Sequence, residues 1–228
     1  QRRLLDTYLQ LATPFAADSK EVSKHRLIET AQVSPNIYRE LQDKGILESY
    51  IVEIGRLNRE VMPVTPQNTL NPAQEKAFAE IKEAFGTKNV ALLHGVTSAG
   101  KTEIYIHLIA EALERGEQVL YMLPEIALTK QIVERLRRVF GNRIGLYHSK
   151  FSDAERVEIW KKQLSDEPYD IILGVRSSVF LPFKNLGLVI VDEEHENSYK
   201  QQEPAPRYNA RNAAIVLASQ FSAKTLLG

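Results

Sequence analysis

One stretch of the chain decides its fold: Val90-Ala91-Leu92-Leu93-His94-Gly95-Val96-Thr97-Ser98-Ala99-Gly100-Lys101-Thr102. Residues 90–94 are an apolar run, which predicts a short buried strand. Residues 95–102 match the pattern Gly-x-x-x-x-Gly-Lys-Thr, and a helix is expected from Glu103 to Arg115. This order of strand, glycine-containing loop and helix is typical of a phosphate-binding P-loop.

The residue types of this loop suit a triphosphate. Backbone N–H groups of the loop and of the helix N-terminus converge on phosphate oxygens, where the helix dipole also favours negative charge. Lys101 is expected to reach the β- and γ-phosphates, and the Thr102 hydroxyl is expected to coordinate Mg²⁺. An ordinary glycine turn before a helix is the alternative, and the flanking strand and helix disfavour it. The predicted cofactors are ATP and Mg²⁺, bound by Gly95, Val96, Thr97, Ser98, Ala99, Gly100, Lys101 and Thr102.

A second apolar run ends in acidic residues: Leu188-Val189-Ile190-Val191-Asp192-Glu193-Glu194-His195. Acids at the end of a buried strand lie in the crevice where α/β sheets bind ligands. Asp192 is predicted to hold Mg²⁺ through water, and Glu193 is placed to orient the attacking water. The predicted catalytic set is Lys101, Asp192, Glu193 and His195. Acids that merely cap a following helix are the alternative, which explains neither the run of three acids nor His195.

The remainder of the second half alternates between helices and apolar strands, which predicts a parallel α/β sheet. Asn71-Pro72 opens a helix that continues to Phe85, and a second helix is expected over 131–140. Further strands are expected at 119–123, 144–147, 170–174 and 188–191, and runs this apolar fit central strands buried on both faces.

The first part of the chain, residues 1–54, predicts a separate small domain. Apolar residues recur at helical spacing in two segments, one ending at Ala12 and one starting at Ser23. Ser34-Pro35 is a helix-start signal, and Gly45 is expected to end that third helix. Alternation over 50–54 predicts a strand.

Three helices and a strand suggest a winged-helix domain at 1–54, with a proline-containing linker at 55–71 and the α/β lobe at 72–228. A small protein-interaction module is the alternative for the first domain. Contact with DNA through Arg39 and Lys44 of its third helix stays open.

Composition narrows the classes of protein. The formal net charge is zero, from 29 basic and 29 acidic side chains, so any contact with nucleic acid has to come from local basic clusters. There is no cysteine, which excludes a disulfide framework and a thiolate metal site in these residues. No apolar run approaches the length of a membrane span, so a soluble, cytoplasmic protein without a membrane partner is expected. The apolar end Leu226-Leu227-Gly228 is interpreted as a strand at the boundary of a longer protein.

Several motifs give a more specific resemblance. Residues 192–195 resemble the DEAD/DEAH box of superfamily-two helicases. Other similar stretches are 123–131, 148–149, 174–180, 183–188, 198–203 and 206–211. The chain resembles the PriA family of bacterial replication-restart helicases, strongly over about 70–228 and more weakly over 1–54. The resemblance implies a RecA-type P-loop motor lobe, with a parallel sheet in three layers, preceded by a winged-helix domain.

The resemblance also implies roles for residues outside the phosphate site. Gln74 becomes an adenine reader, since an amide can donate and accept one hydrogen bond on an adenine edge. The stretch 199–211 is similar to an aromatic-rich loop that couples DNA binding to ATP hydrolysis, although a polar loop anchored by two tyrosines is the alternative. The predicted DNA-binding residues are Arg176, Ser177, Lys200, Arg207, Tyr208 and Arg211.

The implied function is ATP-driven 3′-to-5′ unwinding at stalled forks. The implied partners are forked and single-stranded DNA, primosome proteins and single-strand-binding proteins. Ser98 and Ala99 depart from the family's P-loop, which usually has glycine and serine there. The second motor lobe and the family's zinc-binding cysteines are expected beyond Gly228, so this part alone should bind nucleotide weakly and hydrolyse it slowly. A regulatory or transport P-loop ATPase, a docking module and another superfamily-two translocase remain as alternatives.

Overall fold

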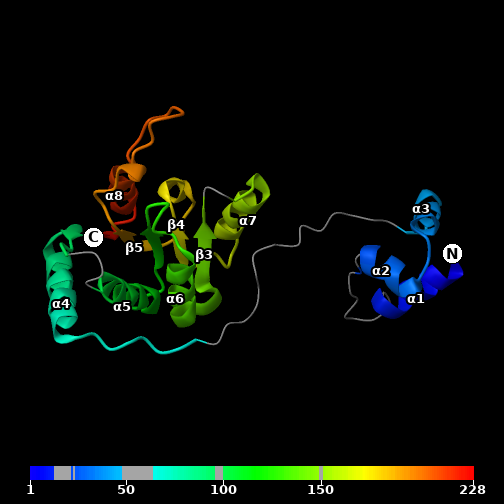
Figure 1. Cartoon of the computed structure of the whole chain (residues 1–228), viewed down its shortest axis with the longest axis horizontal. Helices are drawn as coiled ribbons and strands as arrows, with labels where there is room; N and C mark the ends of the chain where they lie inside the picture. Colours follow the sequence, from blue (N-terminus) through cyan, green and yellow to red (C-terminus); the bar gives the residue numbers. More distant parts are fainter. Residues whose placement is uncertain (13–21, 23, 48–63, 96–99, 149–150) are drawn as a thin grey trace. The chain divides into compact units, whose positions relative to one another are not determined.

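The computed structural model describes residues 1–12, 22, 24–47, 64–95, 100–148 and 151–228. The chain forms two compact units, Gln1–Ile54 and Gly55–Gly228, and each is described by itself (Figure 1). Among the described residues, no helix is both long enough and apolar enough to cross a lipid bilayer.

The first unit contains the three helices that the sequence predicts. They are α1 (Arg2–Ala12), α2 (Lys24–Ala31) and α3 (Pro35–Asp43). Ser34 caps α3 by accepting a hydrogen bond from the Asn36 amide, with Pro35 in the first turn. Gly45 follows the helix with a φ of 65°, a left-handed conformation that glycine adopts without steric cost. Ser23 and the strand expected at 50–54 lie outside the described residues.

A small apolar core holds these helices together. It consists of Leu4, Leu27, Ala31, Tyr38, Leu41 and Leu47. The apolar residues that recur at helical spacing in the sequence therefore form the face that α1, α2 and α3 bury.

The second unit is built on a six-stranded parallel sheet with the order β1-β6-β5-β2-β4-β3. Its strands are β1 (Val90–Leu92), β2 (Gln118–Met122), β3 (Ile144–Tyr147), β4 (Ile171–Gly174), β5 (Leu186–Val191) and β6 (Lys224–Leu227). Every expected strand of this unit is present, including the one near the end of the sequence.

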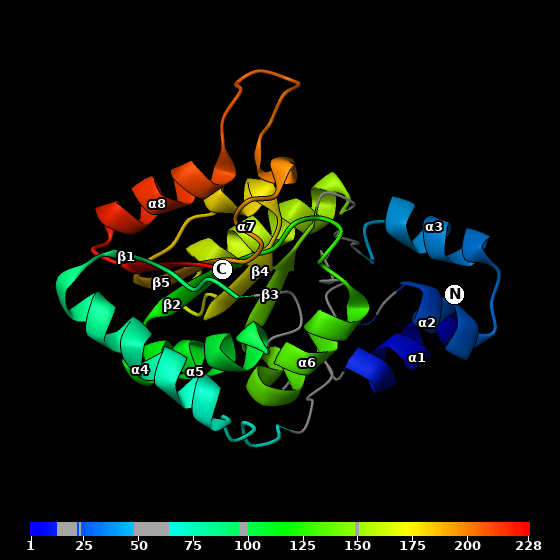
Figure 2. The ribbon, with the colours of Figure 1, turned by 60° about the vertical axis from the view of Figure 1, so that its left-hand side comes forward.

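Helices cover both faces of the sheet, as Figure 2 shows. One face packs on α4 (Pro72–Thr87), α5 (Lys101–Glu114) and α6 (Lys130–Phe140), and the other on α7 (Asp153–Leu164) and α8 (Ala210–Gln220). Three short 3₁₀ turns complete the unit: η1 (Gly141–Arg143), η2 (Arg176–Phe180) and η3 (Asn197–Tyr199). The predicted three-layer α/β lobe is confirmed.

The sequence prediction omitted two helices, although each carries a start signal. Ser152 and Glu155 form a capping box at α7, in which each side chain bonds the other residue's backbone N–H. Asn209 caps α8 by accepting from the Asn212 amide. The sequence predicted a loop over 206–211. In the structure Arg211 lies instead in the first turn of α8.

The prediction of a buried strand at 90–94 is wrong. The strand ends at Leu92, and the side chains at its two ends are exposed, with 39% of Val90 and 59% of Leu92 accessible to solvent. The physical reason is that β1 lies at the edge of the sheet and pairs only with β6. An apolar run fits a central strand, but the sequence does not report the order of strands.

The segment 64–71, within the predicted linker, follows the surface of the second unit. The Thr65 amide donates to the Arg138 carbonyl at 2.7 Å, and the Asn68 side-chain amide donates to Glu103 at 3.3 Å. The His107 ring nitrogen lies 2.8 Å from the Asn68 carbonyl oxygen. This segment is therefore attached to α5 and α6 at several points.

Candidate functional site

The site begins where the central strand β5 ends. The Asp192 amide donates to the Met122 carbonyl at 3.0 Å, and the Glu194 amide donates to the Gly228 carbonyl at 2.9 Å. Strands β2 and β6 therefore hold the chain on both sides as it leaves the sheet. The acidic motif lies at the carboxyl edge of a parallel sheet, where ligands bind in this class of fold.

The Asp192 carboxylate accepts three hydrogen bonds. The Tyr105 hydroxyl donates to Oδ1 at 3.1 Å, and the Tyr121 hydroxyl donates to Oδ2 at 3.3 Å. The backbone amide of Glu193, whose φ is 47°, donates to Oδ1 at 3.1 Å. Burial raises the pKa of Asp192, while the Tyr105 hydrogen bond and the Lys101 charge lower it.

Lys101 faces these acids from the first turn of α5. Its Nζ lies 4.0 Å from Asp192 Oδ1 and 3.6 Å from Glu193 Oε1. The three side chains are 12%, 14% and 25% exposed, so they form a shielded but accessible cluster. The structure thus brings together the two motifs that the sequence analysis assigned to phosphate and metal.

Gln74 lies against the same helix N-terminus. Its side-chain oxygen accepts from the Asn71 amide at 2.9 Å, and its side-chain nitrogen donates to the Gly100 carbonyl at 3.2 Å. Gly100 has a φ of 79°, and a Cβ there would collide with the Gln74 amide. Gln74 is therefore next to the P-loop, with both ends of its amide engaged.

The other residues predicted to bind or act on the nucleotide lie at the two ends of the P-loop, after the acidic motif or outside the described residues. Thr102 follows Lys101 in the first turn of α5 and is half-buried, while Gly95 is exposed after β1. Val96, Thr97, Ser98 and Ala99 lie outside the described residues. His195 is largely exposed, with its ring nitrogen 3.8 Å from Glu193 Oε2.

Some of the predicted DNA-binding residues form one cluster beside the acidic motif. Arg176, at the start of η2, donates to the carbonyls of Ser198 and Lys200 at 3.4 and 3.3 Å. The ring of Tyr208 packs edge-to-face on exposed Phe180, with 4.9 Å between centroids. Burial raises the pKa of Tyr208, and the Arg176 guanidinium lowers it. The side chain of Lys200 is exposed, and Ser177 is half-buried in η2.

The remaining two arginines separate. Arg211 forms a close ion pair with Glu194, so it faces the acidic motif. Arg207 pairs with Glu203 at 2.6 Å, and both side chains are exposed. The segment between Lys200 and Asn209, which are paired by an antiparallel bridge, projects away from the lobe (Figures 1 and 2).

Three residues that shape the acidic end of the site were not predicted from the sequence. They are Tyr105, Tyr121 and Gly228. Tyr199 was predicted to belong to the aromatic-rich loop, but its side chain is buried, with 1% exposed. The Tyr199 hydroxyl donates to the Asp192 carbonyl at 2.7 Å and lies 3.2 Å from the Met122 carbonyl. One usable signal was the spacing of Tyr105, which lies one helical turn after Lys101 and so shares its face.

The residues present fit a magnesium nucleotide. A lysine and a helix N-terminus suit polyphosphate, and carboxylate and hydroxyl oxygens are the hard ligands that Mg²⁺ prefers. Within the described ranges, no group of three or more His, Asp or Glu side chains is arranged to hold a metal ion alone.

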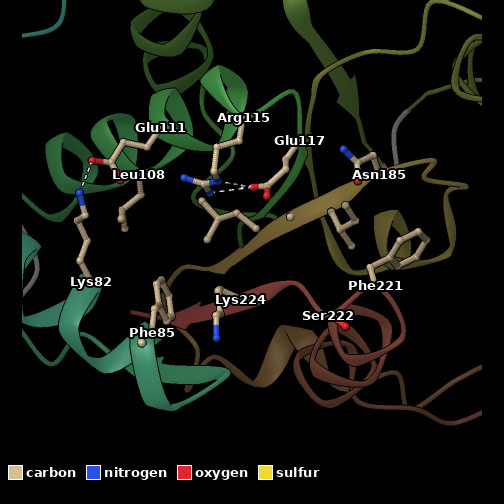
Figure 3. A pocket seen from close by; sticks show the side chains of 14 residues that line it. Lys82, Phe85, Leu108, Glu111, Arg115, Glu117, Asn185, Phe221, Ser222 and Lys224 are labelled. Carbon is tan, nitrogen blue, oxygen red and sulfur yellow. Dashed lines mark hydrogen bonds and ion pairs between the residues drawn. The ribbon is translucent and has the colours of Figure 1, made fainter.

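A hollow of about 400 Å³ lies at the opposite edge of the sheet from the candidate site (Figure 3). Asn185, Leu186, Gly187 and Lys224 line it, at the amino ends of β5 and β6. Its charged lining residues are engaged with each other or with the backbone: Lys82 pairs with Glu111, Arg115 with Glu117, and Lys224 binds the Lys88 carbonyl. None of the predicted site residues lines this hollow, so it is separate from the candidate site.

Comparison with known families identifies this arrangement. Residues 71–224, most of the chain, match the DEAD/DEAH box helicase family. The chain belongs to this family. Residues 1–54 match the winged helix domain of PriA helicase from Bacteroidota, which confirms the winged-helix expectation. The matched range includes Asp192–His195, the residues that resemble the DEAD/DEAH box.

Bacterial proteins named PriA are also similar to this chain. The replication restart protein PriA of Chlamydia pneumoniae is 38% identical over 235 residues, covering 100% of this chain and 30% of that protein. PriA of Helicobacter pylori strain 26695 is 44% identical over 161 residues, covering 71% of this chain and 25% of that protein. The expected resemblance to PriA is confirmed, and the chain spans less than a third of the length of these relatives.

A solved structure shares the lobe. RecG bound to a three-way DNA junction is 25% identical, with a TM-score of 0.50, and the match covers 70% of this chain and 21% of that one. The match over residues 1–54 to a domain described specifically for PriA favours PriA over the other superfamily-two translocases considered as alternatives.

Proposed function

We propose that this chain binds ATP–Mg²⁺ as the first motor lobe of an ATP-dependent DNA helicase that acts in replication restart. The observation that carries this proposal is the approach of Lys101 to Asp192 and Glu193, because it brings the phosphate motif next to the acidic motif. Membership of the DEAD/DEAH box helicase family supports ATP as the bound nucleotide. The replication-restart role rests on the PriA relatives.

Each residue then has a defined task. The amides at the start of α5 and the Lys101 ammonium bind the phosphates, and the Thr102 hydroxyl and Asp192 hold the metal and its water. Bound Mg²⁺ neutralises charge that develops on the phosphate oxygens. Glu193 orients the attacking water, and His195 lies beside it. Gln74 reads the adenine edge, for which it exchanges one of its present hydrogen bonds.

The DNA partner is a forked or single-stranded DNA. Lys200, Tyr208 and exposed Phe180 place a cation and two aromatic rings beside the acidic motif, a combination that suits a single strand. Arg211 pairs with Glu194, and Tyr199 binds the backbone of Asp192. Movement of the 199–211 segment on DNA would therefore act on the acidic motif through two contacts.

Unwinding needs more than this lobe. Arginine fingers typically accelerate hydrolysis by about 10³–10⁵, and in this family the finger is expected on a second lobe. We therefore propose 3′-to-5′ unwinding, and contacts with primosome and single-strand-binding proteins, only for the whole protein. The 228-residue chain should hydrolyse ATP very slowly, and DNA-stimulated turnover of several per second would contradict this division of work.

Binding of a fluorescent ATP analogue in the presence of Mg²⁺ tests the nucleotide site. Lys101→Ala should weaken binding at least about tenfold, because a charge-assisted contact to phosphate is lost. Lys76→Ala is the matched control, since this lysine of α4 is 79% exposed and pairs with Glu80 on the same helix. Equal affinity of wild type and Lys101→Ala would reject the proposed site.

A further inference from the structure

Two buried tyrosines from different elements converge on one carboxylate. Tyr105 lies on α5 one turn after Lys101, and Tyr121 lies on β2 opposite Ile190 of β5. Their hydroxyls reach opposite oxygens of Asp192, Oδ1 at 3.1 Å and Oδ2 at 3.3 Å. Both side chains are 0% exposed, so neither hydroxyl is available to bulk water.

Packing alone does not require these hydroxyls. The two rings meet edge-to-face, with 5.5 Å between centroids and 76° between planes, a geometry equally open to phenylalanine. Burying a hydroxyl costs free energy unless it finds a hydrogen-bond partner. Each hydroxyl instead donates to Asp192, so what distinguishes the tyrosine pair from a phenylalanine pair is its contact with this carboxylate.

The carboxylate has little freedom left. An ionised carboxylate offers about four acceptor positions, and the tyrosine pair and the Glu193 amide occupy three of them. Rotation of the Asp192 carboxylate would break hydrogen bonds from α5, β2 and the main chain together. Counting the donors among the described residues, one acceptor position remains for a further donor.

Gly228 fixes the Tyr105 hydroxyl from the other side. A Cβ at Gly228 would collide with that hydroxyl oxygen. Gly228 cannot easily retreat, because its amide donates to the Val191 carbonyl and its carbonyl accepts from Glu194, each at 2.9 Å. The absence of a side chain at this position therefore makes the space that Tyr105 needs beside Asp192.

We propose that Tyr105 and Tyr121 are positioning residues, which hold the Asp192 carboxylate in one orientation so that it binds the hydration shell of Mg²⁺ through its single remaining acceptor position. This inference rests on the proposed nucleotide site and deepens it. Partners that orient a metal-binding group are worth about 10- to 100-fold in metal affinity at other sites.

The test is the magnesium dependence of nucleotide binding. The affinity for the fluorescent ATP analogue is measured with Mg²⁺ and with EDTA, and the ratio of the two isolates the metal contribution. Tyr105→Phe and Tyr121→Phe should each lower this ratio by about tenfold while leaving the EDTA affinity within about twofold of wild type. Gly228→Ala, which displaces the Tyr105 hydroxyl without changing a tyrosine, should also lower the ratio.

Tyr38→Phe is the matched control. It removes a tyrosine hydroxyl from the buried core of the first unit, which contributes no residue to the proposed site, so its ratio should stay near that of wild type. Circular dichroism of each variant checks folding, and the isosteric exchanges keep the packing of both rings.

The outcomes separate this inference from the proposed function. If wild type shows magnesium-dependent binding and both tyrosine variants keep the wild-type ratio, the positioning role alone is overturned. An equal loss in Tyr38→Phe would also overturn it, because a general effect of removing a buried tyrosine hydroxyl would then explain the loss. Wild type without magnesium-dependent binding would overturn the proposed function and this inference together.

Discussion

Strands β1 and β5 both lead into a motif of the site, yet they differ in almost every physical respect. β5 lies between β2 and β6, and its side chains after Gly187 are buried. β1 lies at the edge, pairs only with β6 and exposes Leu92. Both are apolar runs in the sequence. The difference teaches that such a run predicts a strand, while its neighbours in the sheet decide how much it is buried.

The same contrast separates the two halves of the site. After β5, hydrogen bonds from the neighbouring strands hold Asp192 and Glu194, and two tyrosine hydroxyls hold the Asp192 side chain. After β1, the Leu93 amide donates to the Leu227 carbonyl, and Gly95 is already exposed. The half proposed to bind the metal is thus fixed by the centre of the sheet, whereas the half proposed to bind phosphate starts from its rim.

The largest expected effect compares the two strands directly. Ile190→Ala on β5 should lower the free energy of unfolding of the lobe by about 3 to 4 kcal/mol, because Ile190 is 0% exposed and its loss leaves a cavity. Leu92→Ala on β1 should cost less than about 1 kcal/mol, because the side chain is already 59% exposed. Urea denaturation measures both, and equal losses would refute the contrast.

A smaller effect is expected at the acid that follows β5. Burial raises the pKa of Asp192 above its ordinary value of 3.8, so the ionised carboxylate opposes folding at neutral pH. Asp192→Asn should raise the free energy of unfolding by about 1 to 2 kcal/mol near pH 7. This gain should shrink as the pH falls through the raised folded-state pKa, and it should be smallest below 3.8, where the carboxylate is mostly protonated in both states.

Asp170→Asn is the control for that experiment. Asp170, at the amino end of β4, is 41% exposed and pairs with Arg143 at 2.7 Å. Removing its charge should give a loss of less than about 1 kcal/mol instead of a gain. A neutral-pH gain of the same size at both positions would contradict the role of burial.

The smallest effect concerns the tyrosines around the acidic end. Burial, followed by the charge of Asp192, raises the pKa of Tyr105, Tyr121 and Tyr199. Their protonated forms therefore contribute stability that is fully present below the unfolded value of 10.0 and is lost as the pH rises above it. Each tyrosine steepens the fall by at most about 1.4 kcal/mol per pH unit.

Tyr121→Phe should therefore reduce the alkaline loss of stability by about 1 kcal/mol between about pH 10 and pH 11. Urea denaturation of the lobe from about pH 9 upward measures this difference. Tyr38→Phe, in the first unit, should leave the lobe's transition unchanged. An unaltered slope in Tyr121→Phe would show that this hydroxyl does not titrate with unfolding.

Much of the fold followed from local signals. Ser34-Pro35, Asn71-Pro72 and the apolar runs marked helix starts and strands that the structure contains. Helices α7 and α8 were missed although Ser152 and Asn209 are ordinary caps. Exposed apolar residues, Trp160 and Leu164 on α7 and Val216 on α8, obscure the helical spacing of the buried ones. The edge position of β1 could not be predicted, since strand order depends on contacts between distant parts of the chain.

The candidate site, like the fold, was predictable only where its residues are contiguous in the sequence. Motifs contiguous in sequence, such as 95–102 and 192–195, could be named from residue type and spacing. The surroundings of Asp192 could not, because Tyr105, Tyr121 and Gly228 come from three separate elements and look like core or strand residues in the sequence. Arg211 was assigned to DNA from its charge, and only the fold shows that Glu194 is its partner.

The attachment of the 64–71 segment has a consequence for any force applied to the chain. Asn68 binds Glu103, two residues after Lys101, and Thr65 binds the end of α6. Tension arriving from residues before Val64 would load these two anchor points first, beside the base of the phosphate-binding helix and not at the free end of α4. A pull on residue 64 would therefore be transmitted to the start of α5, next to the proposed nucleotide site. The 64–71 segment is thus a suitable place to introduce a force-sensitive probe or a cross-link that restrains the lobe.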